Sequence, residues 1–344
     1  MRSTIKDVAK EANVSVSTVS RVLNYPDTVH TKTRGAVLRA IDKLNFRPSS
    51  HARHMVGAKT PTLGFVVTGI HNFYFNELFL GVQSTATLQG MDVLLYDVGS
   101  NMENIYSGLA KMKERDCDAL LFTSAFVDET IAAAIRSLDI PVALLLTGGV
   151  DTKLPSFMVD DTSAALDATT YLISRGHEHI AMISGPLADK TTGLTRYNGF
   201  RRALETHHMT FREEYVAFGD YHFESGYRAM EMLLQRRRFH PFTAVFAASD
   251  EMALGAARKL QEQGLSIPAD VSIMGFDDLP IAQMTTPQLT TVNQPFFSIG
   301  QSAAAYLDTA LKGGTSSTDA MTKYFPYHIV ERDSVRKINK ESGG

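Results

Sequence analysis

Side chains suited to binding a polar molecule follow several short apolar runs. Asp250 follows the run at residues 245–249, Asp277 ends the run at residues 274–277, and Tyr221 comes after another. A carboxylate accepts hydrogen bonds from hydroxyl groups, and an aromatic ring can stack on a sugar or a base. If these runs are parallel strands, their carboxyl ends share one edge of a sheet, so these side chains are candidates for one ligand site. Asp250 can equally be the N-cap of a following helix.

Three other segments carry groups of the same kind. A loop rich in aromatic side chains contains Tyr74 and Phe75, although such a cluster is equally compatible with local packing at the start of a helix. Asp160, one of two adjacent aspartates, can accept hydrogen bonds from hydroxyl groups. Arg196 ends a polar segment, and its guanidinium group can donate two parallel hydrogen bonds to a pair of oxygen atoms.

A further set of side chains, near the N-terminus, has the chemistry of base recognition. The guanidinium group of Arg21 can bind O6 and N7 of guanine, the Ser17 hydroxyl can bind a base edge, and Val16 can contact the methyl group of thymine. The neighbouring polar side chains of suitable size to bind phosphates are Ser15, Thr18 and Asn24.

The charge distribution agrees with a polyanionic partner for this region. Residues 1–59 hold eleven Lys and Arg against four acidic residues, a net charge of +7, whereas the rest of the chain carries −10. A small basic segment on an acidic body is expected when only that segment meets a polyanion. A solvated basic surface without a partner is the alternative that charge alone leaves open.

Three helical patterns fill this N-terminal region. The first has apolar residues at positions 5, 8, 9 and 12, and Asn13 is suited to the left-handed conformation that ends a helix. Ser15 offers the N-cap hydroxyl of a second helix over residues 16–23, with positions 19, 22 and 23 on its buried side, and Thr31 is the expected N-cap of a third. This pattern predicts a helix-turn-helix with the base-reading side chains facing outward; the alternative is a generic three-helix bundle.

Two runs of residues in this region resemble the sequences of a known protein family. The run TIKDVAKEANVSVSTVSRVLN at residues 4–24 closely resembles the opening signature of the lactose-repressor family of bacterial transcription regulators, and RAIDKLNFRPSSHAR at residues 39–53 resembles its third helix and hinge. The resemblance implies a hinge helix over residues 49–56 that folds when paired with its twin on DNA. Met55 then stands where the family usually has the Leu that wedges into the minor groove, and Ala52 lies where the two hinges approach.

The remainder of the chain predicts an α/β fold. Apolar runs at residues 63–67, 93–96, 119–122, 142–146, 180–184, 244–248 and 272–275 alternate with amphipathic stretches of helical length. Such runs indicate parallel sheets covered by helices on both faces, and the length suggests two doubly wound halves with a ligand cleft between them.

The resemblance extends through this body and implies a periplasmic-binding-protein architecture, with the chain crossing between halves near residues 160, 292 and 325. We expect a headpiece at residues 1–47, a hinge and linker at 48–60, and an effector-binding and dimerisation domain at 61–344. Its first subdomain covers about 61–160 and 293–325, and its second about 161–292 and 326–344. The positions that match the family's effector pocket are Tyr74, Phe75, Asp160, Arg196, Tyr221 and Asp277, with Asp250 less well matched; Asp189 and Lys190 stay unassigned.

The sequence lacks the features of several other classes of protein. The single cysteine, Cys117, excludes an intrachain disulfide and suits a reducing compartment. There is no signal-peptide pattern and no apolar run near the roughly 18 residues that a membrane span needs, so we expect a cytoplasmic protein with no membrane association. Nucleophile-elbow, phosphate-loop and zinc-protease motifs are missing, and the pair His177 and His179 has no third ligand in view. We therefore expect no catalysis, no metal and no cofactor.

The sequence thus predicts a DNA-binding transcriptional regulator, expected to be a repressor. We expect a homodimer on a palindromic double-stranded operator, with its affinity controlled by a small molecule, a sugar or sugar derivative, in the cleft. Control by a nucleobase or by a protein co-regulator is the alternative. A solute-binding protein without a DNA role would have no use for the basic N-terminal region.

Overall fold

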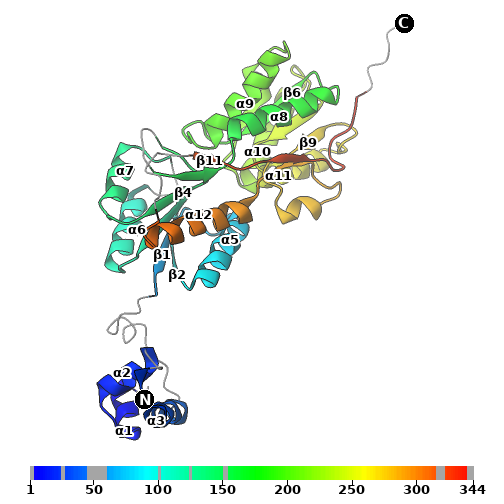
Figure 1. Cartoon of the computed structure of the whole chain (residues 1–344). Coiled ribbons are helices and arrows are strands. Elements are labelled where there is room, and N and C mark those ends of the chain that lie inside the picture. The colour runs from blue at the N-terminus through cyan, green and yellow to red at the C-terminus, as the bar shows by residue number, and fades with distance from the viewer. Residues whose placement is uncertain are drawn as a thin grey trace. The chain divides into compact units, whose positions relative to one another are not determined.

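The computed structural model describes residues 4–24, 28–44, 60–99, 102–123, 126–149, 154–314 and 322–338. The chain divides into two compact units, Met1–Pro61 and Thr62–Gly344 (Figure 1). Ala52 and Met55, and with them the expected hinge helix, lie outside the described residues, as does the side chain of Asn24.

The small unit is a bundle of three short helices, α1 (Ile5–Glu11), α2 (Val16–Asn24) and α3 (Thr31–Lys43). Asn13 turns the chain between α1 and α2 in the left-handed conformation, with φ of 53°. The Ser15 hydroxyl accepts a hydrogen bond from the Thr18 backbone N–H at 3.1 Å, as an N-cap does. The apolar stripes of the helices meet in one core, which contains Val8, Ala9, Val19, Val22, Val37 and Ala40. The predicted N-terminal all-α fold is confirmed.

One detail of this unit differs from the prediction. Helix α3 begins at Thr31, but its N-cap is His30, whose Nδ1 atom accepts a hydrogen bond from the Lys32 backbone N–H at 3.3 Å. The expected Thr31 cap is wrong by one residue, because an imidazole nitrogen can replace the hydroxyl oxygen that the sequence pattern favours at this position.

The large unit begins with a six-stranded sheet in the order β11-β5-β4-β3-β1-β2. All its pairings are parallel. Alternate residues of each strand face opposite sides, so Phe65 packs with helices α5 and α12 while Val66 packs with α6 and α7. We call this part the N-terminal half. Its strands are β1 (Thr62–Val67), β2 (Asp92–Asp97), β3 (Ala119–Thr123), β4 (Val142–Leu145), β5 (Ser156–Met158) and β11 (Thr322–Tyr324), and its helices are α5 (Phe73–Gln89), α6 (Met102–Glu114), α7 (Glu129–Arg136) and α12 (Phe296–Leu311).

A second parallel sheet, in the order β7-β6-β8-β9, forms the C-terminal half. Its helices pack in the pairs α8 with α9 and α10 with α11. Its strands are β6 (Ile180–Ser184), β7 (Val216–Phe218), β8 (Ala244–Ala247) and β9 (Ser272–Met274), its helices are α8 (Asp161–Ser174), α9 (Gly193–Thr206), α10 (Phe223–Arg236) and α11 (Asp250–Glu262), and two 3-10 turns are η2 (Glu213–Tyr215) and η3 (Pro280–Gln283). The predicted doubly wound α/β fold of two subdomains is confirmed.

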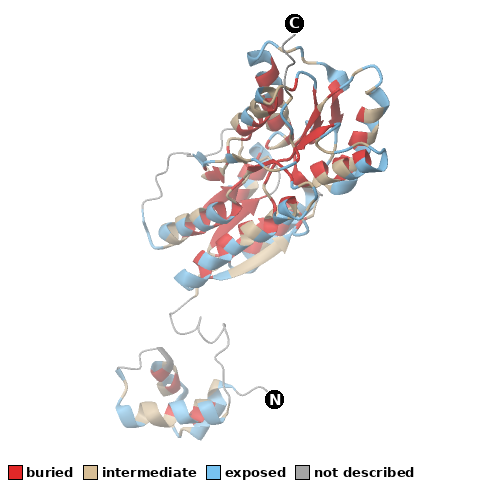
Figure 2. Cartoon of the chain, turned by 90° about the vertical axis from the view of Figure 1, so that its right-hand side faces the viewer, coloured by how far each residue is buried: buried red, intermediate tan, exposed pale blue. Residues whose placement is uncertain are grey.

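The chain passes between the two halves at three places. It leaves the N-terminal half between β5 and α8, returns after β10 (Thr291–Asn293), and leaves again between β11 and β12 (His328–Val330). Strands β10 and β12 pair antiparallel in a separate two-stranded ribbon. Buried residues are concentrated in the strands of both halves and in the helix faces that cover them (Figure 2).

Helices α5 and α12 pack against each other closely, side by side (Figure 1). A Cβ atom on Gly81 of α5 would lie 2.1 Å from the carbonyl oxygen of Phe297, and one on Gly300 of α12 would lie 2.2 Å from that of Leu78. Both positions therefore need glycine for the helices to approach at this distance. Among the described residues, no helix is both long enough and apolar enough to cross a membrane.

Candidate functional site

A cavity of about 210 Å³ lies between the two halves of the large unit, where the carboxyl ends of several parallel strands meet. Thr68 follows β1, Tyr221 follows β7 and Asp277 follows β9. This is the usual position of a ligand site in doubly wound folds. The cavity is lined by Thr68, Asn72, Tyr74, Thr123, Leu146, Met158, Val159, Asp161, Asp189, Thr191, Thr192, Arg196, Tyr221, Ser249, Asp277, Gln294 and Phe296.

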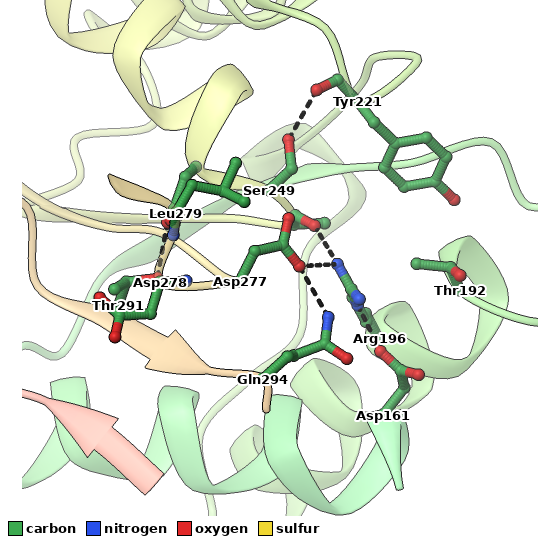
Figure 3. Close-up of polar contacts among 12 residues, drawn as sticks. Asp161, Thr192, Arg196, Tyr221, Ser249, Asp277, Asp278, Leu279, Thr291 and Gln294 are labelled. Atoms are coloured by element: carbon green, nitrogen blue, oxygen red, sulfur yellow. Dashed lines mark hydrogen bonds and ion pairs between the residues drawn. The ribbon is translucent and has the colours of Figure 1, made fainter. Parts of the chain in front are cut away.

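Arg196 is the central cation of the cavity (Figure 3). It extends from the first turn of α9, and its Nε atom donates to Asp161 Oδ1 at 2.6 Å, while Nη1 donates to the Ala248 carbonyl oxygen at 2.5 Å. Its guanidinium carbon lies 3.8 Å from the centre of the Phe276 ring. Because it is held on three sides and is almost fully buried, the guanidinium group is oriented before any ligand binds.

Asp277, which follows strand β9, faces Arg196. Arg196 Nη1 lies 3.6 Å from Asp277 Oδ1, and the Gln294 side-chain amide donates to the same oxygen at 2.7 Å (Figure 3). Burial raises the pKa of the Asp277 carboxyl group to about 7, against the opposing effects of Arg196 and Gln294. Gln294 follows the crossover strand β10, so it connects this site to the polypeptide that joins the halves.

A third carboxylate, that of Asp189, organises the side of the cavity formed by the C-terminal half. Its Oδ1 atom accepts hydrogen bonds from the backbone N–H groups of Thr191 and Thr192 at 3.0 and 3.1 Å, and its Oδ2 atom accepts one from the Tyr221 hydroxyl. A Cβ atom on Gly185 would lie 2.4 Å from the Tyr221 ring, so glycine is required there for the ring to reach this position.

Aromatic rings and strained backbone complete the cavity. Tyr74 and Phe296 form an apolar wall, with ring centres 5.5 Å apart and planes inclined by 31°. Leu146, Tyr221 and Asp277 have positive φ values of 54°, 74° and 120°. Such conformations cost about 1–3 kcal/mol each for residues with a side chain and are concentrated at binding sites.

Four of the predicted effector residues therefore meet in the cavity: Tyr74, Arg196, Tyr221 and Asp277. Phe75 does not; it is buried in the core, where its ring packs against Phe65 and Phe79 with centre distances of 5.9 and 5.6 Å. Because Phe75 follows Tyr74 on helix α5, its side chain is turned by about 100° and points towards the sheet.

Asp160 and Asp250 are also placed elsewhere. Asp160 is the N-cap of α8 and accepts a hydrogen bond from the Ser163 backbone N–H at 3.1 Å, while the next residue, Asp161, enters the cavity. Asp250 is fully buried and accepts from the Thr291 hydroxyl at 2.6 Å and the Leu279 backbone N–H at 2.8 Å. It thus joins α11 to the strand β10, and Ser249 rather than Asp250 caps α11.

Sequence reasoning missed most of the residues that line the cavity, and four of them are informative. The sequence favours Asp160 over its neighbour Asp161, and it assigns no role to Asp189. Gln294 and Phe296 lie beyond the crossover strand β10 rather than after a strand of either parallel sheet. The crossover expected near residue 292 is the signal that could have identified this last pair.

Most of the side chains expected to contact DNA lie on helix α2 or directly before it. On α2, Val19 and Val22 are buried, whereas Ser17 and Arg21 are exposed and Val16 is 42% exposed. The Ser15 hydroxyl lies 2.8 Å from those of Ser17 and Thr18. The side chains expected to contact bases are therefore exposed, with Val16 and Ser17 in the first turn of α2 and Arg21 in its last turn, as a helix that enters a major groove requires.

Within the described ranges, no group of three or more His, Cys, Asp or Glu side chains could hold a metal ion. His177 is buried with its Nδ1 atom 2.8 Å from the Thr243 hydroxyl, and His179 lies beside Tyr215. The two imidazoles therefore have separate structural partners.

Comparison with known proteins identifies both units. Residues 4–49 match the model of the lacI family of bacterial regulatory proteins, and residues 169–335 match that of the periplasmic binding protein-like domain. The chain is 35% identical over 336 residues to catabolite control protein A of Priestia megaterium, covering 98% of this chain and 100% of that protein. It is 36% identical over 335 residues to the transcriptional repressor PurR of Proteus mirabilis (strain HI4320), covering 97% of each.

A solved structure is similar over the same extent. The lac repressor dimer bound to operator and the anti-inducer ONPF has a TM-score of 0.88 and 26% identity, covering 98% of this chain and 100% of that one.

Proposed function

Because this chain belongs to the lacI family of bacterial regulatory proteins, we propose that it is a transcriptional repressor whose operator affinity is set by a small polyhydroxylated molecule. A member of this family is a DNA-binding regulator and not an enzyme. The observation that carries the proposal is the cavity between the halves, in which Arg196 and the carboxylates of Asp161, Asp189 and Asp277 face the same space. We expect this regulator to act in the cytoplasm.

The exposed face of α2 supports a sequence-specific role for the small unit. Arg21 can read guanine, and the hydroxyl groups of Ser15 and Thr18 can hold phosphates beside it. One such helix reads only a few base pairs, so we expect a homodimer on a palindromic operator. The similar lac repressor structure is a dimer bound to operator, which supports the same arrangement here.

The lining of the cavity favours a saccharide. Asp277 and Asp189 can accept hydrogen bonds from hydroxyl groups, Arg196, Gln294 and Asn72 can donate them, and the apolar wall suits one face of a sugar ring. A nucleobase can stack on the same rings, but it carries fewer hydrogen-bond donors than a saccharide for the three carboxylates that line the cavity. The lining of the cavity thus favours a molecule with hydrogen-bond donors and acceptors alternating around its ring.

Effector binding is expected to change the closure of the two halves and thereby the operator affinity. Each half supplies ligand contacts, so a bound molecule stabilises one relative position of the halves over others. The coupling is reciprocal, which means that DNA changes the affinity for the effector by the same factor.

A thermal-shift screen tests this proposal. The full chain is scanned with monosaccharides, disaccharides, sugar phosphates and nucleobases, since a ligand at 100 times its Kd stabilises the folded state by about 2.7 kcal/mol. We expect a saccharide to raise the Tm of the wild-type chain and not that of Asp277→Asn. The control is Glu262→Ala, which changes a carboxylate on α11 outside the cavity and should keep the full shift.

The outcomes of the screen are distinct. A shift with a nucleobase alone, lost in Asp277→Asn, would replace the saccharide by a base as the effector. A saccharide shift that Asp277→Asn retains would remove this cavity from the proposal. Operator selection with random duplexes tests the DNA-binding part separately.

A further inference from the structure

A short loop of the C-terminal half contacts both the cavity and the N-terminal half. We call residues 189–192, which lie directly before α9, the contact loop. Three of them, Asp189, Thr191 and Thr192, line the cavity. The fourth, Lys190, does not; its Nζ atom lies 5.5 Å from the centre of the Phe126 ring, which belongs to the N-terminal half between β3 and α7. This distance is within the roughly 6 Å of a cation–π contact.

A second contact beside this one also joins the halves. The Thr191 hydroxyl lies 3.2 Å from the Thr147 hydroxyl, and both side chains are buried. Thr147 follows β4, so it belongs to the N-terminal half. Two adjacent residues of the contact loop therefore reach the other half, one at the segment that follows β3 and one at the segment that follows β4.

The contact loop is fixed to its own half. The Leu194 backbone N–H donates to the Asp189 carbonyl oxygen at 2.9 Å, and the Thr195 hydroxyl donates to the Thr191 carbonyl oxygen at 2.6 Å. These bonds join the loop to the first turns of α9, the helix that also carries Arg196. The loop therefore moves together with α9 when the halves change their relative position.

The two partners of the loop in the N-terminal half are joined in the same way. Val127, the residue after Phe126, is fully buried and forms a parallel β-bridge with Gly149. Its backbone N–H donates to the Gly148 carbonyl oxygen at 2.9 Å, one residue beyond Thr147. The segments that follow β3 and β4 thus form one support, and a movement of one half relative to the other breaks both contacts with the loop.

We infer that Lys190 is a positioning residue of the ligand site, whose cation–π contact with Phe126 stabilises the closed cleft. Closure places the neighbouring side chains of the contact loop at the cavity. Because Lys190 is exposed, the contact should change the ratio of closed to open molecules by about two- to fivefold, which corresponds to about 0.5–1 kcal/mol. The inference concerns the cleft on which the proposed function rests, but its test needs neither effector nor DNA, so the two can fail separately.

Double electron–electron resonance on the full chain measures the distance between the halves. Spin labels are attached at Ala133→Cys in α7 and Gln235→Cys in α10, two exposed positions, while the native Cys117 is buried. Labelled chains are diluted with unlabelled ones, so that only distances within one chain are recorded. In Lys190→Met we expect the ratio of long to short distances to rise by about two- to fivefold. Phe126→Leu, which removes the ring and leaves the cation, should give the same rise.

Three further variants separate this contact from a general loss of stability. Lys190→Arg keeps the cation and should keep the wild-type distances. Arg201→Met is the matched control, because the Arg201 guanidinium carbon lies 4.9 Å from the centre of the Phe211 ring in the same half, so its loss should leave the distances unchanged. The double variant Lys190→Met/Phe126→Leu should show no rise beyond either single variant, since both remove one contact. Unchanged distances in both single variants, an equal rise in Arg201→Met, or a rise in Lys190→Arg as large as in Lys190→Met would overturn the inference.

Discussion

Arg196 Nη1 lies 3.6 Å from Asp277 Oδ1, and both side chains are almost completely buried between the two halves of the large unit. This pair joins two elements that are 81 positions apart in the chain, the first turn of α9 and the end of β9. A buried ion pair contributes little net stability, because desolvation of both charges opposes their attraction. Its position in the cavity fits a role in ligand binding better than a role in holding the fold.

The Asp277 carboxyl group should make stability depend on pH. Its pKa is raised by burial to about 7 from 3.8, so the folded state binds an extra proton between these values and the free energy of unfolding falls as pH rises from about 4 to about 7. Asp277→Asn should lack this component, whose slope is at most about 1.4 kcal/mol per pH unit. Urea denaturation between pH 4 and 8 measures it. The exposed Asp92→Asn serves as control, and equal slopes in wild type and Asp277→Asn would contradict the assignment.

Arg21 should determine the base preference of the small unit. Arg21→Ala should lose about 1–3 kcal/mol of discrimination at one base pair of each half-site, because its guanidinium group is exposed on the recognition face of α2. Selection from random duplexes, followed by affinity measurements at fixed salt, gives the preference at each position. Lys43→Ala is the control, since Lys43 pairs with Glu11 at 2.8 Å and should affect affinity without changing the selected sequence. An unaltered preference at every position in Arg21→Ala would reject its role.

His177 should make the large unit sensitive to acid. Burial lowers its pKa to about 4 from 6.5, so the unfolded state binds more protons between these values. The free energy of unfolding therefore falls as pH decreases from about 6.5 to about 4, and this loss should be smaller in His177→Asn. Denaturant titrations across this range test the prediction, with the exposed His207→Asn as a matched control. Parallel wild-type and His177→Asn curves would show that another group dominates.

The contact between α5 and α12 should tolerate no side chain at Gly300. Gly300→Ala places a methyl group 2.2 Å from the Leu78 carbonyl oxygen, so the helices must separate, at a cost of about 1–3 kcal/mol in the free energy of unfolding. Gly35→Ala in α3 is the contrasting control, because its nearest neighbour is the Arg39 guanidinium group at 3.6 Å and alanine favours a helix by about 0.5–1 kcal/mol. Denaturant titration measures the free energy of unfolding of each unit. If Gly300→Ala changed that of the large unit no more than Gly35→Ala changes that of the small unit, the close packing of α5 and α12 would be contradicted.

Local periodicity was sufficient to predict the longer strands and the helices of the small unit, but not the short strands β5, β10, β11 and β12. The apolar runs at residues 180–184 and 119–122 became β6 and β3, and the spacing of Val8, Ala9 and Val19 defined the core of the small unit. A parallel strand buried on both faces must be apolar throughout, and a helix buried on one face must be apolar every three to four residues. These requirements act within a few residues of each other, so the sequence shows them directly.

The choice of side chains that face the cavity was decided by the tertiary structure. Asp160 and Asp161 are adjacent and chemically identical, yet only Asp161 meets Arg196, because a helix start between them turns successive side chains by about 100°. Asp250 follows a strand as the prediction required, but the crossover strand β10 covers it and takes its hydrogen bonds. The rings of His71 and His222 likewise lie in contact between the two halves although these residues are 151 positions apart, and no local pattern records that approach.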